Sequence, residues 1–232
     1  MKHVLTLFFC ILVMFVKAQT IHSFNHYLQT SNQVLFVKTP AANSIKGKMF
    51  LYERKHNNKP WESVDSFPVT VGRSGLAKDV NAAISFNDTL PVKHEGDGKS
   101  PSGIFKLWKV FSYHKLENLK MPFVQVDSNF YCVDDVSSRY YNQLILSDTA
   151  AKDFNSFEHM KLPGNQYEYG VWVLYNSNPA VAGNGSCIFL HVWSDENTPT
   201  SGCTAMAKEN MLKLIHWLDE KKKPVLLQVV EK

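Results

Sequence analysis

The stretch FLHVWSDENTPTSGCTAM, residues 189–206, joins a strand-like run to a polar loop and a glycine-flanked cysteine. His191 ends the apolar run, and Cys203 follows Gly202 twelve positions later. The thiolate is the nucleophilic form of cysteine, and a neighbouring imidazole can accept the thiol proton and hold the thiolate as an ion pair. The spacing is compatible with a loop that folds back, so the stretch predicts a cysteine nucleophile with a histidine base.

The apolar run belongs to a strand expected over residues 186–193. Side chains alternate along a strand. One face is therefore expected to carry Cys187, Phe189 and His191, and the other to carry Ile188, Leu190 and Val192. A histidine at a strand end is held by the sheet and can still be reached from a cleft.

The remaining chain is rich in strand patterns. Strands are expected over residues 33–39, 47–54, 61–73, 123–135, 167–176 and 224–230, and helices over 20–33, 149–160 and 208–221. The last helix carries an apolar stripe of Met211, Leu214, Ile215 and Leu218. Strands outnumber helices and no βαβ alternation occurs, so the fold class is mainly β (α+β), with one or two helices packed against sheets.

The charge of the chain gives little support for a nucleic-acid partner. The 232 residues carry a formal net charge of +4, with no basic block dense enough for nucleic-acid binding. The run Lys221–Lys223 is interpreted as a solvated helix end. Length and composition fit a single domain over 19–232, and we expect a monomer.

The N-terminus has the pattern of a secretory signal peptide over residues 1–18. Lys2 precedes an uncharged run that is short for a membrane span of about 20 residues, and Ala18 precedes the expected cleavage point. An uncleaved anchor is the alternative. We expect an exported protein of the periplasm or cell envelope, without an integral span after cleavage.

The mature chain would keep Cys132, Cys187 and Cys203. An odd count in an exported protein leaves at least one thiol unpaired. A Cys132–Cys187 disulfide would leave Cys203 free, and two buried free thiols are an equally open alternative. A zinc site that joins Cys203 and His191 to His216 or His94 lacks the usual ligand spacing, so no metal is expected.

The order of motifs resembles the L,D-transpeptidase catalytic domain family, which has the YkuD fold. That family carries a strand histidine followed by a motif of the form S/T-x-G-C, matched here by His191 and by Thr200, Ser201, Gly202 and Cys203. Its upstream G-x-K-T-P-x-G-x-F segment is similar to Gly98, Lys99, Ser100, Pro101, Gly103 and Phe105. The likeness runs over residues 33–230 and implies a β-sandwich-like domain.

The resemblance implies acyl transfer on peptidoglycan stem peptides without a cofactor. Cys203 would attack the peptide carbonyl and form a thioester, with His191 as base and then as acid. The backbone carbonyl of Val192 would orient the imidazole. The N–H groups of Gly202 and Cys203 would stabilise the oxyanion. Ser201, Thr200 and Trp193 would contact substrate.

Two positions depart from the family pattern. Ala205 stands where an arginine is usual, and Ser201 stands where a histidine or lysine is usual. The resemblance implies that the family arginine helps to bind a substrate carboxylate or holds the loop. Arg139 beside Tyr140 is the candidate replacement, because a guanidinium binds carboxylates through two parallel hydrogen bonds. Residues Lys93, His94, Glu95 and Asp97 are interpreted as loop surface.

Three functions remain open from the sequence. The first is an L,D-transpeptidase that crosslinks peptidoglycan or attaches another amine to it. The second is an L,D-carboxypeptidase or another peptidoglycan peptide hydrolase with the same Cys203–His191 pair, an alternative that Ala205 favours. The third is a non-catalytic wall-binding domain, which retention of both His191 and Cys203 disfavours.

Overall fold

The structure, a computed structural model, describes residues 21–79, 89–147 and 152–231. The expected signal peptide, residues 1–18, lies outside these described residues. Over the described ranges, no helix has the length and apolar character needed to cross a bilayer.

Strands dominate the described chain, as the sequence predicts. They are β1 Gln33–Thr39, β2 Lys46–Glu53, β3 Glu62–Thr70, β4 Leu76–Lys78, β5 Ser100–Ser112, β6 Phe123–Gln125, β7 Phe130–Val133, β8 Leu144–Leu146, β9 Phe157–His159, β10 Tyr169–Val173, β11 Phe189–Val192, β12 Thr204–Met206 and β13 Val225–Val230. Helix α2 covers Lys208–Trp217, and a 3₁₀ turn covers Glu220–Lys222. The mainly β class with a packed helix is confirmed.

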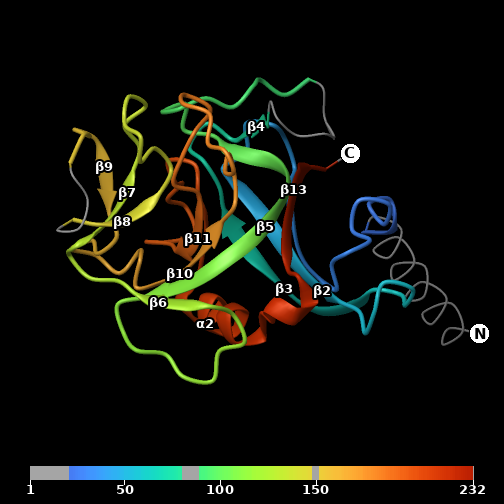
Figure 1. Cartoon of the computed structure of the whole chain (residues 1–232). Helices are drawn as coiled ribbons and strands as arrows, with labels where there is room; N and C mark the ends of the chain where they lie inside the picture. Colours follow the sequence, from blue (N-terminus) through green and yellow to red (C-terminus); the bar gives the residue numbers. More distant parts are fainter. Residues whose placement is uncertain (1–20, 80–88, 148–151, 232) are drawn as a thin grey trace, which may run out of the picture.

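The main sheet closes on itself. Its strand order is β10-β11-β12-β3-β2-β1-β13-β5-β4, and β10 also pairs with β5. Strand β5 is long enough, at 13 residues, to pair with β13 and β10 at different points along its length. The result is a barrel-like sheet around an apolar interior (Figure 1). Closure satisfies strand edges that would otherwise be open to other chains.

Helix α2 packs against β10 and β11 and closes one side of the core (Figure 1). Its apolar stripe is fully buried, as expected from the spacing of Met211, Leu214, Ile215 and Leu218. The opposite face of the helix carries charged side chains such as Lys213. The helix therefore contacts the two strands that lead to His191, and it helps to fix their position.

A second, smaller sheet has the order β8-β7-β9 and lies beside the barrel (Figure 1). The sequence predicted a helix over 149–160, and this prediction is wrong for the described residues 152–160. Phe157–His159 form β9 instead, with Cys132 opposite Glu158 in the antiparallel pairing with β7. The ring of Phe157 packs on that of Tyr131 at 4.4 Å. Cross-strand packing outweighs the weak helical preference of this segment.

The short helix expected over 20–33 is also largely absent from its described part. Residues 23–27 form hydrogen-bonded turns after Ile21 and His22. Ile21 and Leu28 pack into a cluster with Trp61 on the outer side of β1 and β13. Burial of these two side chains holds the segment against the sheet without a continuous helix.

Candidate active site

Cys203 and His191 lie on neighbouring strands of the main sheet. Strands β11 and β12 are parallel, with Leu190 opposite Thr204 and His191 opposite Ala205. Cys203, directly before β12, therefore lies beside Phe189, whose N–H donates to the Cys203 Sγ atom at 3.3 Å. Alternation along both strands turns Cys203 and His191 to the same face.

The predicted alternation of β11 is confirmed by its packing. Phe189 and Cys187 belong to an apolar cluster that also contains Cys203, whereas Leu190 and Val192 point into the barrel core. The cluster with Cys203 fills the space between the main sheet and the small sheet. The candidate site thus lies where two sheets meet.

The imidazole of His191 is held by a backbone carbonyl. Its Nδ1 atom lies 2.8 Å from the Val192 carbonyl oxygen. A carbonyl only accepts hydrogen bonds, so Nδ1 carries the proton and Nε2 keeps its lone pair. The Tyr167 ring packs edge-on against the imidazole at 5.2 Å between centroids. Val192 thus makes the contact that the resemblance implied.

Burial sets the protonation of both groups. It lowers the pKa of His191 to about 4, although the carbonyls of Val192 and Gln166 act in the opposite direction. It raises the pKa of the Cys203 thiol, and the nearby Glu158 carboxylate raises that pKa further. Burial therefore favours the neutral thiol and the neutral imidazole over the expected thiolate–imidazolium ion pair, because desolvation disfavours both charges.

The loop before Cys203 is fixed by two hydroxyl groups. Thr200 Oγ1 donates to the Cys203 carbonyl oxygen at 2.6 Å, and Ser100 Oγ donates to the same oxygen at 2.8 Å. The N–H of Gly202 donates to Thr200 Oγ1 at 3.1 Å. This N–H is therefore occupied in the empty site, and an oxyanion would have to compete with Thr200 for it.

Close packing explains the glycine before the nucleophile. A Cβ atom at Gly202 would lie 3.2 Å from the Lys99 carbonyl oxygen and 3.4 Å from the Ile188 side chain. The segment around Lys99 and Ser100 is the upstream motif of the sequence. The two motifs therefore contact each other directly, which accounts for their joint presence.

An open cleft of about 650 Å³ exposes this face of the site. Its lining includes the predicted residues His191, Trp193, Thr200, Ser201, Gly202 and Cys203. It also includes Arg73, Lys93, Glu95, Asp134, Glu158, Tyr167 and Ala205. Cys203 is only 6% exposed at its floor. The cleft carries both basic and acidic side chains.

Arg139 and Tyr140 are not brought to the cleft. Arg139 is paired with Asp153 at 3.4 Å, has a side chain 62% exposed, and stacks over the Tyr140 ring. The geometry therefore gives no support to Arg139 as the carboxylate anchor. Ala205, at the family's arginine position, is buried on the cleft wall with 1% of its surface exposed.

Arg73 is the guanidinium that the structure does bring to the cleft. Its Nη1 donates to Ser201 Oγ at 3.1 Å, and its backbone N–H donates to the Thr200 carbonyl at 2.8 Å. Its side chain crosses Gly98, where a Cβ atom would lie 2.9 Å from the guanidinium and where φ is +68°. Gly98 is required there for both reasons. In the sequence, the only signal for a guanidinium near Cys203 is the strand end VTVGRSG, which draws attention through its glycines.

The loop from Lys93 to Lys99 is only partly the solvated surface that the sequence suggested: His94 is exposed, whereas Lys93 is buried. Lys93 and Asp97 form an ion pair at 2.7 Å with both side chains 3% exposed. Asp97 also accepts from the Lys99 N–H at 2.8 Å. This buried pair shapes the loop that leads into β5, and so it positions Ser100 beneath Cys203.

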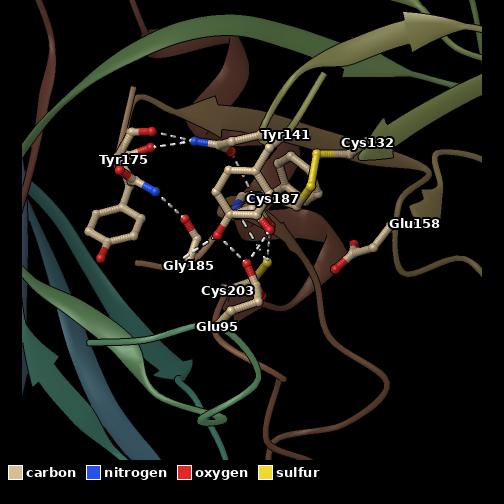
Figure 2. The surroundings of a disulfide bond; sticks show 12 residues. Glu95, Cys132, Tyr141, Glu158, Tyr175, Gly185, Cys187 and Cys203 are labelled. Atoms are coloured by element: carbon tan, nitrogen blue, oxygen red, sulfur yellow. Dashed lines mark hydrogen bonds between the residues drawn. A yellow bond between two sulfur atoms is a disulfide. The ribbon is translucent and has the colours of Figure 1, made fainter. Parts of the chain in front are cut away.

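A disulfide joins the small sheet to the catalytic strand. Cys132 of β7 is bonded to Cys187, two residues before Phe189 (Figure 2). Cys203 is the free cysteine among those that the structure describes. The open choice between a bridge and two free thiols is thereby decided in favour of the bridge. The bond fixes the cleft wall that carries Glu158 relative to the nucleophile.

A hydrogen-bond network holds the loop that precedes Cys187. Asn142 Nδ2 donates to the Tyr175 and Asn176 carbonyls, and Asn142 Oδ1 accepts from the Cys187 N–H at 2.9 Å. Tyr141 Oη accepts from the Gly185 N–H at 3.0 Å and donates to Glu95 at 2.5 Å (Figure 2).

Across residues 21–79, 89–147 and 152–231, no group of three or more His, Cys, Asp or Glu side chains is placed to hold a metal ion.

Comparison with known proteins supports the same assignment. The family model of the L,D-transpeptidase catalytic domain, YkuD, matches residues 43–227, which is most of the chain. Neither the curated proteins nor the solved structures provided a match. The chain belongs to the L,D-transpeptidase catalytic domain family.

Proposed function

We propose that the protein is an exported cysteine L,D-transpeptidase that acts on peptidoglycan stem peptides through a Cys203 thioester. Members of this family act on peptidoglycan peptides. The observation that carries the proposal is the shared cleft: a free thiol and a carbonyl-oriented imidazole line the same cleft of about 650 Å³. That volume lies within the range of ordinary ligand sites.

The first half-reaction follows from this arrangement. The Cys203 sulfur attacks the peptide carbonyl carbon, and its proton passes to His191 Nε2. The C–N bond then breaks as His191 returns that proton to the leaving amine. Because burial favours the neutral form of both groups, the thiol proton moves to His191 as the sulfur attacks the substrate carbonyl, and no free thiolate has to form beforehand. The Cys203 N–H, and the Gly202 N–H once released by Thr200, would stabilise the oxyanion.

Arg73 would bind a carboxylate of the stem peptide. Its guanidinium reaches Ser201, next to the nucleophile motif, and it lines the cleft. The ion pair between Arg73 and the substrate carboxylate would replace the one made by the arginine that the family usually carries at the position of Ala205. Arg73→Gln should then raise KM more than it lowers kcat, whereas Arg139→Gln should leave KM unchanged. An unchanged KM in Arg73→Gln would remove this residue from substrate binding.

Export is supported by the oxidation state of the cysteines. The Cys132–Cys187 bond is of the kind that persists in oxidising compartments and is rare in the cytosol. This agrees with the signal-like residues 1–18. We therefore propose a location in the periplasm or cell envelope, and detection of the mature chain starting at Gln19 in an envelope fraction would test this location.

Hydrolysis with the same nucleophile is the second candidate. Ala205 puts a methyl group on the cleft wall where the family carries an arginine, so less of the cleft is reserved for a charged acceptor. The enzyme would then be an L,D-carboxypeptidase or would cut another peptide link of the wall. A peptidoglycan-binding domain without activity is the third outcome.

Mass spectrometry of muropeptides incubated with the mature protein separates these outcomes. Disaccharide tetrapeptide alone and with an added amine acceptor provides the two arms, and Cys203→Ala is the matched inactive control. New dimers or amine adducts indicate transfer, and shortened stems indicate hydrolysis. Unchanged muropeptides with retained binding would overturn the proposed enzymatic function.

A further inference from the structure

Glu158 is a carboxylate at the nucleophile that the proposed first half-reaction does not use. It belongs to β9, lines the cleft with Cys203, and stands opposite Cys132 in the small sheet. The Cys132–Cys187 bond fixes that sheet to the strand of His191. Figure 2 shows the Glu158 carboxylate turned toward Cys203, with the Cys132–Cys187 bond to one side of them.

The two oxygens of Glu158 have different surroundings. Tyr167 Oη donates to Oε2 at 2.5 Å. Oε1 has no hydrogen-bond partner among the described residues, and Glu158 is part of the cleft lining. Glu158 also forms no ion pair with any described residue. One oxygen is thus fixed and the other is available to a substrate atom.

Two neighbouring carboxylates act on Glu158 together with its burial. Burial first, and then the charges of Asp134 and Glu95, bring the pKa of Glu158 to about 7 against the opposing hydrogen bond from Tyr167. The titratable and charged groups around the carboxylate are Tyr167, Asp134, Glu95 and Cys203, together with Arg73, Lys93 and His191 of the same cleft. A general base works best with a pKa near the working pH.

Tyr167 links this carboxylate to both catalytic residues. Its ring packs on His191, its hydroxyl holds Glu158, and its interaction with Cys203 favours the thiolate. His191, with a pKa near 4, is the weaker base of the two in the resting site. Because environments that separate two pKa values divide acid and base tasks, Glu158 and His191 are suited to different proton transfers.

We propose that Glu158, held by Tyr167, is the general base of the second half-reaction, in which an amine or water resolves the Cys203 thioester. This inference rests on the proposed function. The incoming nitrogen or oxygen forms a bond to the thioester carbon and gives its proton to Glu158 Oε1. The C–S bond breaks, and its electron pair goes to the Cys203 sulfur. The proton that Glu158 Oε1 has taken up then passes to that sulfur, which restores the thiol and the carboxylate, while Tyr167 keeps its hydrogen bond to Oε2.

The test separates formation and breakdown of the thioester in the full-length mature protein. Intact-protein mass spectrometry follows a single turnover of disaccharide tetrapeptide, with and without an amine acceptor. Glu158→Gln keeps an oxygen that can accept from Tyr167 and removes the base. It should acylate within about threefold of the wild-type rate, accumulate acyl-enzyme, and release it at least about 100-fold more slowly.

Two further measurements exclude a structural explanation. Wild-type release should follow one ionisation near pH 7, rising with pH, and this inflection should vanish in Glu158→Gln. Formate should restore part of the release rate in Glu158→Ala, whereas chloride at equal ionic strength should not. Glu168→Gln is the matched control, because Glu168 adjoins Tyr167 in sequence but pairs with Lys208 at 2.8 Å away from the cleft lining.

The outcomes distinguish the two proposals. A wild-type protein that never forms an acyl-enzyme overturns the proposed function itself. A wild-type protein that acylates, together with a Glu158→Gln variant that releases product at the wild-type rate, overturns only the role of Glu158. If Glu158→Gln releases product slowly only in the amine-free arm, Glu158 activates water. If release is slow in both arms, Glu158 activates water and amine alike. Both outcomes support the inference.

Discussion

Two tyrosine–glutamate pairs each contribute a carboxylate to the cleft lining, and they have the same hydrogen-bond length and different surroundings. Tyr167 donates to Glu158 at 2.5 Å. Tyr141 donates to Glu95 at 2.5 Å (Figure 2). The Glu95 carboxylate accepts two more bonds, from Ser186 Oγ at 2.7 Å and from the Gly96 N–H at 3.2 Å. Among the described residues, Glu158 accepts only the bond from Tyr167.

The difference shows how partners decide what a buried carboxylate can do. Glu95 is held by three donors and joins two loops, so its oxygens are committed to structure. Glu158 keeps one oxygen toward the cleft, and burial shifts its pKa toward neutrality. The disulfide connects the two pairs, because Cys187 follows Ser186 and Cys132 lies opposite Glu158.

The largest expected effect concerns the thiol that the Tyr167–Glu158 pair faces. Cys203→Ala should lower activity by more than about 1,000-fold, since no other described cysteine is free to form the thioester. Muropeptide turnover measures the decrease, and circular dichroism checks that the fold is kept. Full activity in the variant would remove the reason for assigning chemistry to either pair.

Removing the Cys132–Cys187 disulfide, which connects the two tyrosine–glutamate pairs, should have the next largest effect, a loss of stability. Cys132→Ser with Cys187→Ser should lower the free energy of unfolding by about 2–4 kcal/mol, because the bridge closes a long loop. Urea unfolding of the wild type and of the double variant measures this difference in free energy of unfolding. The release step should slow as well, since the small sheet that carries Glu158 loses its fixed position. A variant as stable as wild type would show that the two sheets hold together without the bond.

Glu158→Gln should change the pH dependence of stability, with a definite sign. The pKa of Glu158 is about 7 in the folded state and near 4.5 when unfolded, so the folded protein binds more protons between these values. Wild type therefore loses stability as pH rises through this window, and the variant does not. At pH 8 the variant should be more stable by about 1–3 kcal/mol, and at pH 4 the difference should be small.

Urea unfolding at the two pH values checks this result. An equal difference at pH 4 and pH 8 would mean that Glu158 has no raised pKa, and the contrast between the two pairs would lose its electrostatic basis.

Tyr141→Phe should lower the stability of the protein without changing the rate of thioester release, whereas Tyr167→Phe should slow thioester release. Tyr141→Phe removes a donor to Glu95 and the acceptor for the Gly185 N–H, so unfolding free energy should fall by about 1–2 kcal/mol. Thioester release should keep its wild-type rate, whereas Tyr167→Phe should slow release. Thermal unfolding and single-turnover mass spectrometry measure the two effects. Slow release in both variants would make the pairs equivalent.

The smallest effect concerns the reactivity of the resting thiol. The Glu158 anion raises the pKa of Cys203, so Glu158→Gln should increase the rate of alkylation by iodoacetamide at pH 8 by about two- to fivefold. Tyr141→Phe, which leaves Glu158 in place, should not change it. Equal rates in wild type and Glu158→Gln would show that the carboxylate does not act on the thiol.

The longer strands of this protein could be predicted from local sequence, whereas the three-residue strands β4, β8, β9 and β12 could not. The apolar run at Gln33–Thr39 forms β1 with the predicted bounds, and β11 presents its residues to the predicted faces. Strand β9 could not be predicted because three residues give no periodic signal, and their strand state depends on pairing with β7. Barrel closure could not be predicted because it depends on the pairing of β5 with β10, which are far apart in the chain.

The candidate site was predicted in part. Cys203 and His191 were found because their motif is short and local. Arg73, Glu158 and Tyr167 were not, because each comes from a different segment and reaches the cleft only through the fold. Arg139 was favoured by composition, yet it pairs with Asp153 at the surface.

The sequence by itself determined the family and the β-rich class, and it predicted Cys203 as nucleophile with His191 as its base, because these depend on local order and spacing. Only the tertiary structure decided the protonation of the site, the Cys132–Cys187 bond and the charged groups around the thiol. The physical reason is that desolvation, pairing and cross-linking depend on distances between segments, and a linear sequence does not contain those distances.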